Sequence, residues 1–257
     1  MKMGPGVSPE SPQRPNDSKT IPTVPTKGLR FFLILIIISF LFLAIAPLSQ
    51  AAVGDTVIAK WKDNKKGAFT IHFDDSTISQ ADNAVPAMIE RGLVGTWYVN
   101  PGNERYKARK QVWEVIALNG GEELAAHTLT HADDDHYIGT YEEADYEIGE
   151  SARIIWSLYP AARSKLLSYC WPGGVSWGIS KRQKDELMAK YHLMHRPNYK
   201  CVRNVDADQM LWYAQSALAF GNWDGIWFHG IGGDWISVDK NEFWKFLDKL
   251  VEVKNKL

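Results

Sequence analysis

GAFTIHFDD, residues 67–75, is a run rich in β-branched and aromatic residues that ends in two carboxylates. This composition predicts a strand with Asp74 and Asp75 at its C-terminal end. In an extended chain, adjacent side chains point to opposite sides, so one carboxylate can bind a metal while the other acts as a base. A solvated acidic turn is the alternative, because Asp is favoured where strands stop.

Predicted strands and helices alternate about six times along the rest of the chain. Further strands are expected at 94–99, 123–126, 165–170, 193–195 and 225–228. Helical periods between capping and stop signals predict helices at 80–91 (with Pro86 in its true first turn), 110–119, 140–158, 180–191, 206–220 and 238–255. This alternation is typical of an α/β protein with a mainly parallel sheet, here in one domain.

Two histidines four residues apart follow the predicted strand at 123–126. His127 and His131 can share a metal whether the segment is a helical turn or a tight loop. Two imidazoles and one carboxylate form a common ligand set that leaves positions for water and substrate. Two unrelated surface histidines are the alternative. The chain has only 7 His, and these two follow a strand, so the pattern favours a metal site.

Two other groups also come directly after predicted strands. Trp171–Gly174 (WPGG) can present a backbone N–H to a developing oxyanion, although alone it is simply a turn. His229 suits a general acid, although a lone His at a strand end is more often structural. Active sites of α/β proteins form where strands end, so these groups are expected to converge with the carboxylates and histidines.

The N-terminus reads as a targeting segment. Residues 1–28 have the composition of a disordered tail, and residues 29–51 combine a basic flank, an uncharged apolar run at 31–46 and small residues before a cleavage point after Ala51. The run is short of the roughly 20 residues that span a bilayer. We expect a signal peptide, with an uncleaved signal anchor as the alternative. The protein is then secreted, or periplasmic in the cell envelope, and residues 52–257 form its catalytic domain.

Charge and composition restrict the partners. The segment up to Ala51 holds five basic and two acidic residues, which leaves 24 and 28 in the rest, a net charge of −4 without a basic cluster. This argues against nucleic acid. The 11 Trp residues favour a carbohydrate ligand as a group, although each one alone is more simply explained by packing. Cys170 and Cys201 are equally compatible with a disulfide and with two buried thiols.

Together these motifs resemble the polysaccharide deacetylase family (carbohydrate esterase family 4). Its Thr-Phe-Asp-Asp motif corresponds to His72–Asp75, and its His-Ser/Thr-x-x-His motif is complete at His127–His131. Its Arg-x-Pro-x-Gly motif corresponds to Cys170–Gly174, and its Leu-x-His motif to Trp227–His229. Residues 96–100 are similar to the family's second strand. The resemblance runs from about Gly67 to the C-terminus, in the same order and spacing.

The resemblance implies a distorted (β/α) barrel and one divalent metal, commonly zinc. Asp74 becomes the general base and His229 the general acid. Asp75, His127 and His131 become the metal ligands, and the Gly173 N–H takes the oxyanion position. Trp171, Trp227 and Tyr98 are candidate substrate contacts. The implied substrate is a polysaccharide with N- or O-linked acetyl groups, and a membrane is a partner only if the signal segment stays uncleaved.

Three departures from the family pattern stand out. Cys170 occupies the position of the arginine that pairs with the base, so Asp74 is expected to lose its charge partner. No clear match exists for the aspartate that supports the catalytic histidine; Asp206, Asp208 and Asp224 are candidates. Trp227 replaces the leucine of the acetyl pocket. The acidic stretch after His131 reads as a solvated loop.

These departures leave alternatives to a deacetylase. One is a catalytically impaired homologue that binds glycan or metal. Another is a hydrolase of the same fold that cleaves non-peptide C–N bonds, which the export signal disfavours. A purely structural exported protein is disfavoured because both aspartates and all three motif histidines are present.

Overall fold

The computed structural model describes residues 61–133, 137–159 and 166–257. The expected tail at 1–28, the expected signal segment at 29–51 and the expected domain start at 52 lie outside these residues, as does most of the acidic stretch at 133–136. All described residues belong to one compact unit, residues 58–257. None of the helices in these ranges is long and apolar enough to cross a membrane.

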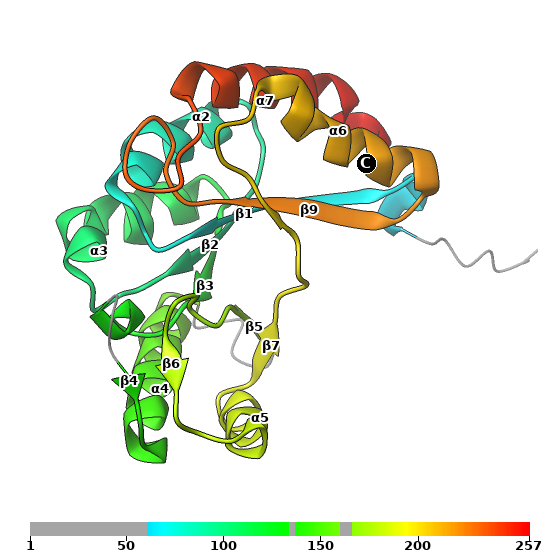
Figure 1. Ribbon diagram of the computed structural model, residues 1–257. Coiled ribbons are helices and arrows are strands. Elements are labelled where there is room, and N and C mark those ends of the chain that lie inside the picture. The colour runs from blue at the N-terminus through cyan, green and yellow to red at the C-terminus, as the bar shows by residue number, and fades with distance from the viewer. Residues whose placement is uncertain (1–60, 134–136, 160–165) are drawn as a thin grey trace, which may run out of the picture. The chain divides into compact units, whose positions relative to one another are not determined.

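A seven-stranded parallel sheet forms the centre of the described unit (Figure 1). Its strands are β1 Ala68–Asp74, β2 Thr96–Val99, β3 Glu123–Ala126, β5 Leu167–Tyr169, β7 Leu193–His195, β8 Lys200–Cys201 and β9 Trp223–Phe228. They lie in the order β7-β5-β3-β2-β1-β9-β8, and every neighbouring pair is parallel. The sheet curls into a half-barrel with β7 and β8 as its two edges. The predicted distorted (β/α) barrel is confirmed.

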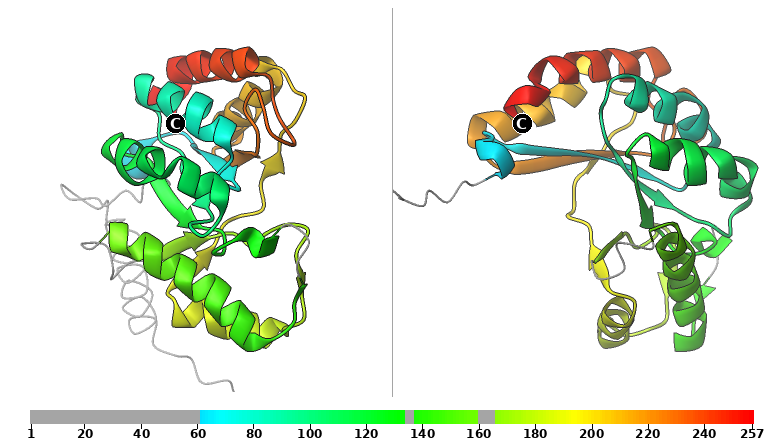
Figure 2. Two further views of the ribbon diagram at one scale, coloured as in Figure 1. Left: turned by 90° about the vertical axis from the view of Figure 1, so that its left-hand side faces the viewer. Right: turned by 180° about the vertical axis from the view of Figure 1, so that it is seen from behind.

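Helices cover the outside of the curled sheet (Figure 2). The α-helices are α2 Val85–Glu90, α3 Glu104–Ala108, α4 Tyr141–Leu158, α5 Lys181–Lys190, α6 Ala207–Phe220 and α7 Lys240–Val253. Capping boxes start α4 at Thr140, α5 at Ser180 and α6 at Asp206, since each cap side chain accepts from the third backbone N–H while that residue's side chain accepts from the cap. Pro86 lies in the first turn of α2, as predicted.

Several short elements were not predicted. They are β8, α3, the two-residue strands β4 Tyr137–Ile138 and β6 Ser176–Trp177, and the 3₁₀ turns Lys62–Asn64, His131–Asp133 and Lys254–Lys256. Two helical segments are π-helical, at Gln80–Ala84 and Val112–Ala117, and the second replaces most of the helix expected at 110–119. Two residues are too few to establish an alternating pattern, so β4, β6 and β8 leave no signal in the sequence.

The alternation of side chains along β1 orients the site. Phe73 is fully buried, stacks on Trp97 with ring centroids 3.8 Å apart, and meets Phe243 of α7 on the outer side of the sheet. Its neighbours His72 and Asp74 therefore point to the inner, concave side. One strand thus anchors the core with one face and supplies polar groups with the other.

Candidate active site

A cavity of about 460 Å³ opens where the strands end. Its lining residues are Asp74, Asp75, His127, His131, Trp171, Gly173, Gly174, Arg196, Trp227, His229, Trp235 and Ile236. Every residue expected to act in catalysis or metal binding is among them. Tyr98 is the one expected site residue that does not line the cavity.

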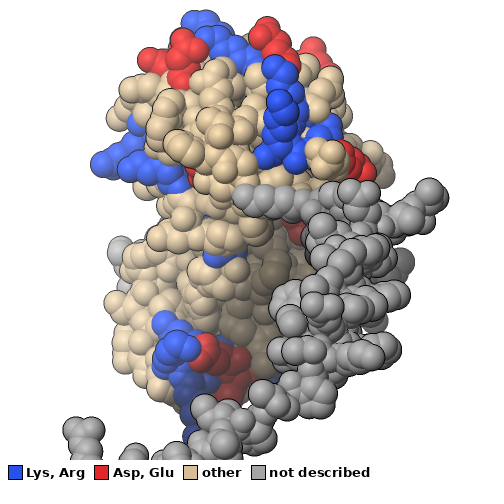
Figure 3. Space-filling model, turned by 90° about the vertical axis from the view of Figure 1, so that its right-hand side faces the viewer, with Lys and Arg blue, Asp and Glu red and all other residues tan. Residues whose placement is uncertain are grey.

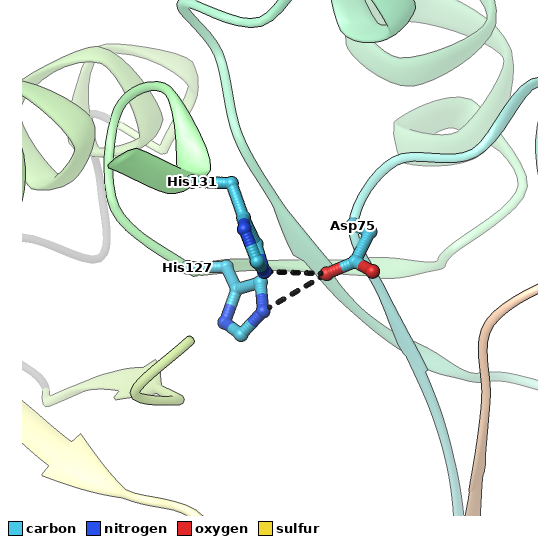
Figure 4. Close-up of side chains that lie close together, drawn as sticks. All are labelled: Asp75, His127 and His131. Atoms are coloured by element: carbon cyan, nitrogen blue, oxygen red, sulfur yellow. Dashed lines mark hydrogen bonds and ion pairs between the residues drawn. The ribbon is translucent and has the colours of Figure 1, made fainter. Parts of the chain in front are cut away.

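Asp75, His127 and His131 converge on one point (Figure 4). The Oδ1 atom of Asp75 lies 3.1 Å from Nε2 of His127 and 3.2 Å from Nε2 of His131. All three side chains are buried. Burial raises the pKa of Asp75, but the hydrogen bonds and positive charge of the two histidines outweigh it and hold this pKa well below its usual range. Asp75 is therefore an anion at neutral pH.

Two of these three residues, Asp75 and His131, have a left-handed backbone conformation that sets the direction of their side chains. Asp75 has φ 76°, and His131 has φ 66° in a tight loop, so the histidine spacing reflects a loop and not a helical turn. Non-glycine residues rarely adopt this conformation, and surrounding contacts must hold it in place. Buried Asn100 donates from Nδ2 to the carbonyl of His127, and Glu147 of α4 accepts from the Thr130 N–H at 3.0 Å.

The donor set fits a divalent cation. Nδ1 of His127 lies 2.8 Å from the carbonyl oxygen of Cys170, which can only accept, so Nδ1 carries a proton. In a neutral ring, Nε2 then directs a lone pair at the Asp75 carboxylate. Two acceptors 3.1 Å apart need either a proton or a cation between them, and two imidazoles with one carboxylate suit a borderline metal such as zinc.

Asp74 does not lack a charge partner. Arg196 donates from Nη1 to Oδ1 at 2.5 Å and from Nη2 to Oδ2 at 2.7 Å, a bidentate pair buried from solvent. The guanidinium lies between two rings, 4.8 Å from the centroid of Tyr98 and 4.7 Å from that of Trp227. The expectation that Cys170 leaves Asp74 unpaired is wrong, because the arginine comes from another strand.

The register of the sheet explains this substitution. Tyr169 of β5 pairs with His195 of β7, so Cys170 and Arg196 follow at neighbouring strand ends. Arg196 reaches Asp74 of β1 from the end of β7, and Cys170 is near enough for the charge of Asp74 to add to burial in raising the pKa of its thiol. The sequence contained a signal, since Arg196 comes directly after the strand predicted at 193–195. Without the strand order, no pattern shows that this end lies beside Asp74.

His229 lies on the opposite side of Asp75 from the two histidines. Its Nε2 is 3.5 Å from Oδ2 of Asp75, and its Nδ1 is 3.9 Å from the thiol of Cys201. Burial lowers the pKa of His229, and the charge of Asp75 offsets this only in part.

Within the described residues, the three aspartates proposed as the support of His229 bond to other groups. Asp206 caps α6, Asp208 pairs with Lys249, and Asp224 accepts from the Gly225 N–H. Cys201 occupies the side of the ring where an acid was expected.

The walls of the cavity are mainly aromatic and glycine. Gly173 and Gly174 are exposed, and no atom lies within 4 Å of where a Cβ of either would be, so the backbone there is accessible to a ligand. Trp171 and Trp227 are half-buried walls. Tyr98 is instead 1% exposed, bonded to Ser168 and packed under Arg196, so it supports the site from below.

The two cysteines are free thiols, so the disulfide alternative is not realised. Burial raises the pKa of the Cys170 thiol above its ordinary value and that of Cys201 to about 11. Both are therefore protonated at neutral pH, and the fold does not depend on a covalent link between β5 and β8.

The fold is a curled parallel half-barrel with carboxylates and histidines at the ends of its strands. Comparison with known proteins is more specific. Residues 62–190, half of the chain, match the family model described as polysaccharide deacetylase. The chain belongs to the polysaccharide deacetylase family, a family of carbohydrate esterases that uses a divalent metal.

Solved structures share the fold at low identity. A carbohydrate esterase family 4 pseudoenzyme from Bacillus anthracis is 10% identical, with a TM-score of 0.51 over 74% of this chain and 62% of that chain. A peptidoglycan deacetylase from Bacillus subtilis is 16% identical, with a TM-score of 0.46 over 74% of this chain and 85% of that chain. A gellan lyase from a Bacillus species is 30% identical over 80 residues, which are 31% of this chain and 3% of that protein.

Proposed function

We propose that this protein is a metal-dependent hydrolase that removes acetyl groups from an exported polysaccharide and releases acetate. The observation that carries the proposal is the cavity in which Asp75, His127 and His131 lie close enough together to hold a cation, beside the Asp74–Arg196 pair. One group of residues can hold a metal, and the other holds a carboxylate in a fixed orientation next to it.

The proposed metal ligands are Asp75, His127 and His131. These residues would hold a divalent ion, zinc in our proposal, which would supply a Lewis acid for an acetyl carbonyl and for a water molecule. The carbonyl of Cys170 holds the His127 ring in the tautomer that presents Nε2 to the cation. The group Asp75, His127 and His131 offers one oxygen and two nitrogen donors and includes neither of the two free thiols. This donor set is consistent with zinc.

Asp74 is the proposed general base. Arg196 fixes both oxygens of its carboxylate, so the base is oriented before substrate binds. As water attacks the acetyl carbon, Asp74 takes the water proton, and the Gly173 N–H donates to the developing oxyanion. His229 then protonates the departing sugar oxygen or nitrogen. Its lowered pKa makes the protonated ring a stronger acid for this step.

The sugar is proposed to lie against Trp171 and Trp227. Both rings line the cavity and remain partly exposed, as a stacking surface for a pyranose requires. The apolar run at 31–46 supports export of the protein to the compartment where such polymers lie, with signal anchoring as the alternative. Stacking on an aromatic ring recognises the face of a sugar and not its acetyl linkage, so the proposal covers both N-acetyl and O-acetyl groups.

Acetate release from acetylated xylan, chitin oligomers and peptidoglycan tests the proposal. We expect release from at least one polymer, loss of activity with a chelator, and recovery when zinc is added back. Asp74→Asn should abolish release while the protein retains bound metal. Wild-type protein that binds metal but releases no acetate from any of these polymers, or Asp74→Asn that stays active, would contradict the proposal.

A further inference from the structure

Trp235 is a cavity residue to which neither the sequence motifs nor the proposed chemistry gives a role. It lies in the loop between β9 and α7 and is 37% exposed. Its Nε1–H donates to Oδ2 of Asp75 at 3.1 Å. A large aromatic ring at the cavity rim thus makes a polar bond to a proposed metal ligand.

The loop that carries Trp235 is firmly tied. The Gly230 N–H donates to the Trp235 carbonyl at 3.1 Å, and Oδ2 of Asp234 accepts from the Ser79 N–H at 2.7 Å. Trp235 stands between two residues with left-handed backbone, Asp234 at φ 59° and Ile236 at φ 48°. Such conformations persist only where contacts impose them, so the ring is placed by the loop and not by chance packing.

The hydrogen bond from Trp235 makes the surroundings of the two Asp75 carboxylate oxygens different. Oδ1 faces the imidazoles of His127 and His131, whereas Oδ2 faces the indole N–H and, at 3.5 Å, His229. An oxygen that already accepts a hydrogen bond is a poorer second ligand. Oδ1 is therefore the atom left for a cation, and open positions remain for water and the acetyl oxygen.

The ring itself forms a wall of the cavity with Trp171 and Trp227. The guanidinium of Arg105 lies 4.6 Å from its centroid and steadies it from outside the lining. An immobilised ring at an open rim is suited to contact a sugar next to the one that carries the acetyl group.

We propose that Trp235 is a positioning residue for Asp75 and, through its ring, a contact for the polysaccharide chain. The inference rests on the proposed metal-dependent deacetylation. Two substitutions distinguish the hydrogen bond to Asp75 from the ring contact with substrate. Phenylalanine keeps an aromatic ring and removes the N–H, whereas leucine removes both.

The chain offers a matched control in Trp244. This residue is 36% exposed, donates from Nε1 to the carbonyl of Asn83 at 3.5 Å, and has Lys240 5.0 Å from its ring. It therefore resembles Trp235 in exposure and in both kinds of contact, but it does not line the cavity.

Zinc chloride is titrated into the metal-free wild type and into Trp235→Phe, Trp235→Leu and Trp244→Phe. We expect both Trp235 variants to bind zinc about 10-fold more weakly and Trp244→Phe to bind like wild type. On the preferred acetylated polymer, the KM of Trp235→Leu should rise several-fold beyond that of Trp235→Phe. On a small acetyl ester that lacks sugar, the two variants should have equal KM values.

Wild-type zinc affinity in Trp235→Phe and Trp235→Leu would overturn the positioning role, and so would an equal loss in Trp244→Phe. Equal KM values for the two Trp235 variants on the polymer would overturn the contact with substrate. Failure of wild type to bind zinc or release acetate counts against the proposed function itself. A functional wild type with unaffected Trp235 variants counts against this inference alone.

Discussion

The two sides of the cavity differ in how closely they follow the family pattern. On the side of Asp75, the histidines stand where the motifs put them and form a compact donor set. On the side of Asp74, the motif position holds Cys170, and the arginine comes from the end of β7. Metal ligands must meet at one point within about 2 Å of a cation, which ties them to particular positions. A charge partner needs only to reach a carboxylate, so any neighbouring strand end can supply it.

Breaking the metal side should have the largest effect. His127→Ala removes one of three donors, and we expect loss of retained zinc after dialysis and at least about a 10³-fold fall in acetate release. Metal analysis and kinetics measure the two effects. His195→Ala, at an exposed histidine of β7, is the control and should retain both zinc and activity. Undiminished zinc in His127→Ala would remove this histidine from the ligand set.

Removing the charge partner of Asp74 should lower activity less than removing a proposed metal ligand does. An arginine placed at position 170, where the family motif has it, should restore part of that activity. Arg196→Gln leaves buried Asp74 without its cation, and we expect about a 100-fold fall in kcat at unchanged zinc affinity. Adding Cys170→Arg to this variant should recover at least about 10-fold, because residues 170 and 196 follow neighbouring strands. If the double variant is no better than Arg196→Gln alone, the two positions are not interchangeable.

Glu122 is a buried carboxylate that contrasts with Asp74, because its hydrogen-bond donors are neutral N–H groups and not a guanidinium. It accepts from the Gly95 N–H and the Trp97 Nε1–H, yet burial raises its pKa from 4.5 to about 7. The native state therefore binds more protons between these values, and the free energy of unfolding falls as pH rises through that range.

Glu122→Gln stays neutral at every pH and should remove this fall. Urea unfolding at pH 5 and pH 8 should show wild type losing on the order of 1–2 kcal/mol relative to the variant. Exposed Glu123→Gln serves as the control. Parallel pH curves for wild type and Glu122→Gln would show that the Glu122 carboxylate is ionised equally in both states.

The smallest effect is expected at Cys201, the neighbour of His229. A thiol 3.9 Å from Nδ1 makes a weak contact, so Cys201→Ala should change acetate release by less than about threefold. Steady-state kinetics on the preferred polymer decide this. A loss above about 10-fold would mean that the thiol holds the His229 ring and does the work of the missing acid.

Much of this architecture could be predicted from local sequence. The strands that end at Asp74 and Phe228 carry β-branched and aromatic runs, and the helices α4, α5 and α6 carry caps at Thr140, Ser180 and Asp206. Such signals act within a few residues, so one sequence displays them, and the N-cap Asp239 of α7 is of the same kind. The histidine pair and the double aspartate were visible for the same reason.

Other parts depend on contacts between distant segments. Arg196 is 122 residues from Asp74, and Trp235 is 160 residues from Asp75. Strand order and loop path decide these meetings, and neither leaves a periodic trace. For Tyr98, the strand was predicted but the position of the side chain was not. The Arg196 guanidinium lies over the Tyr98 ring, so the ring does not reach the cavity.

The open edge of the sheet gives the Asp74–Arg196 pair a second consequence. Within the described residues, β7 and β8 are not hydrogen-bonded to each other, so no ladder closes the curl. Arg196 starts at the end of β7, rests on Trp227 of β9 and grips Asp74 of β1. The Arg196 side chain therefore connects the edge strand β7 with β9 and β1, which lie toward the other edge of the sheet. Figure 3 shows the side of the molecule that lies to the right in Figure 1; where it is not covered, charged groups gather in its upper and lower parts and the surface between them is mostly uncharged. The ion pair that orients the proposed base therefore also links the end of β7 to β1, so we expect its loss to lower both the proposed activity and the rigidity of this sheet edge.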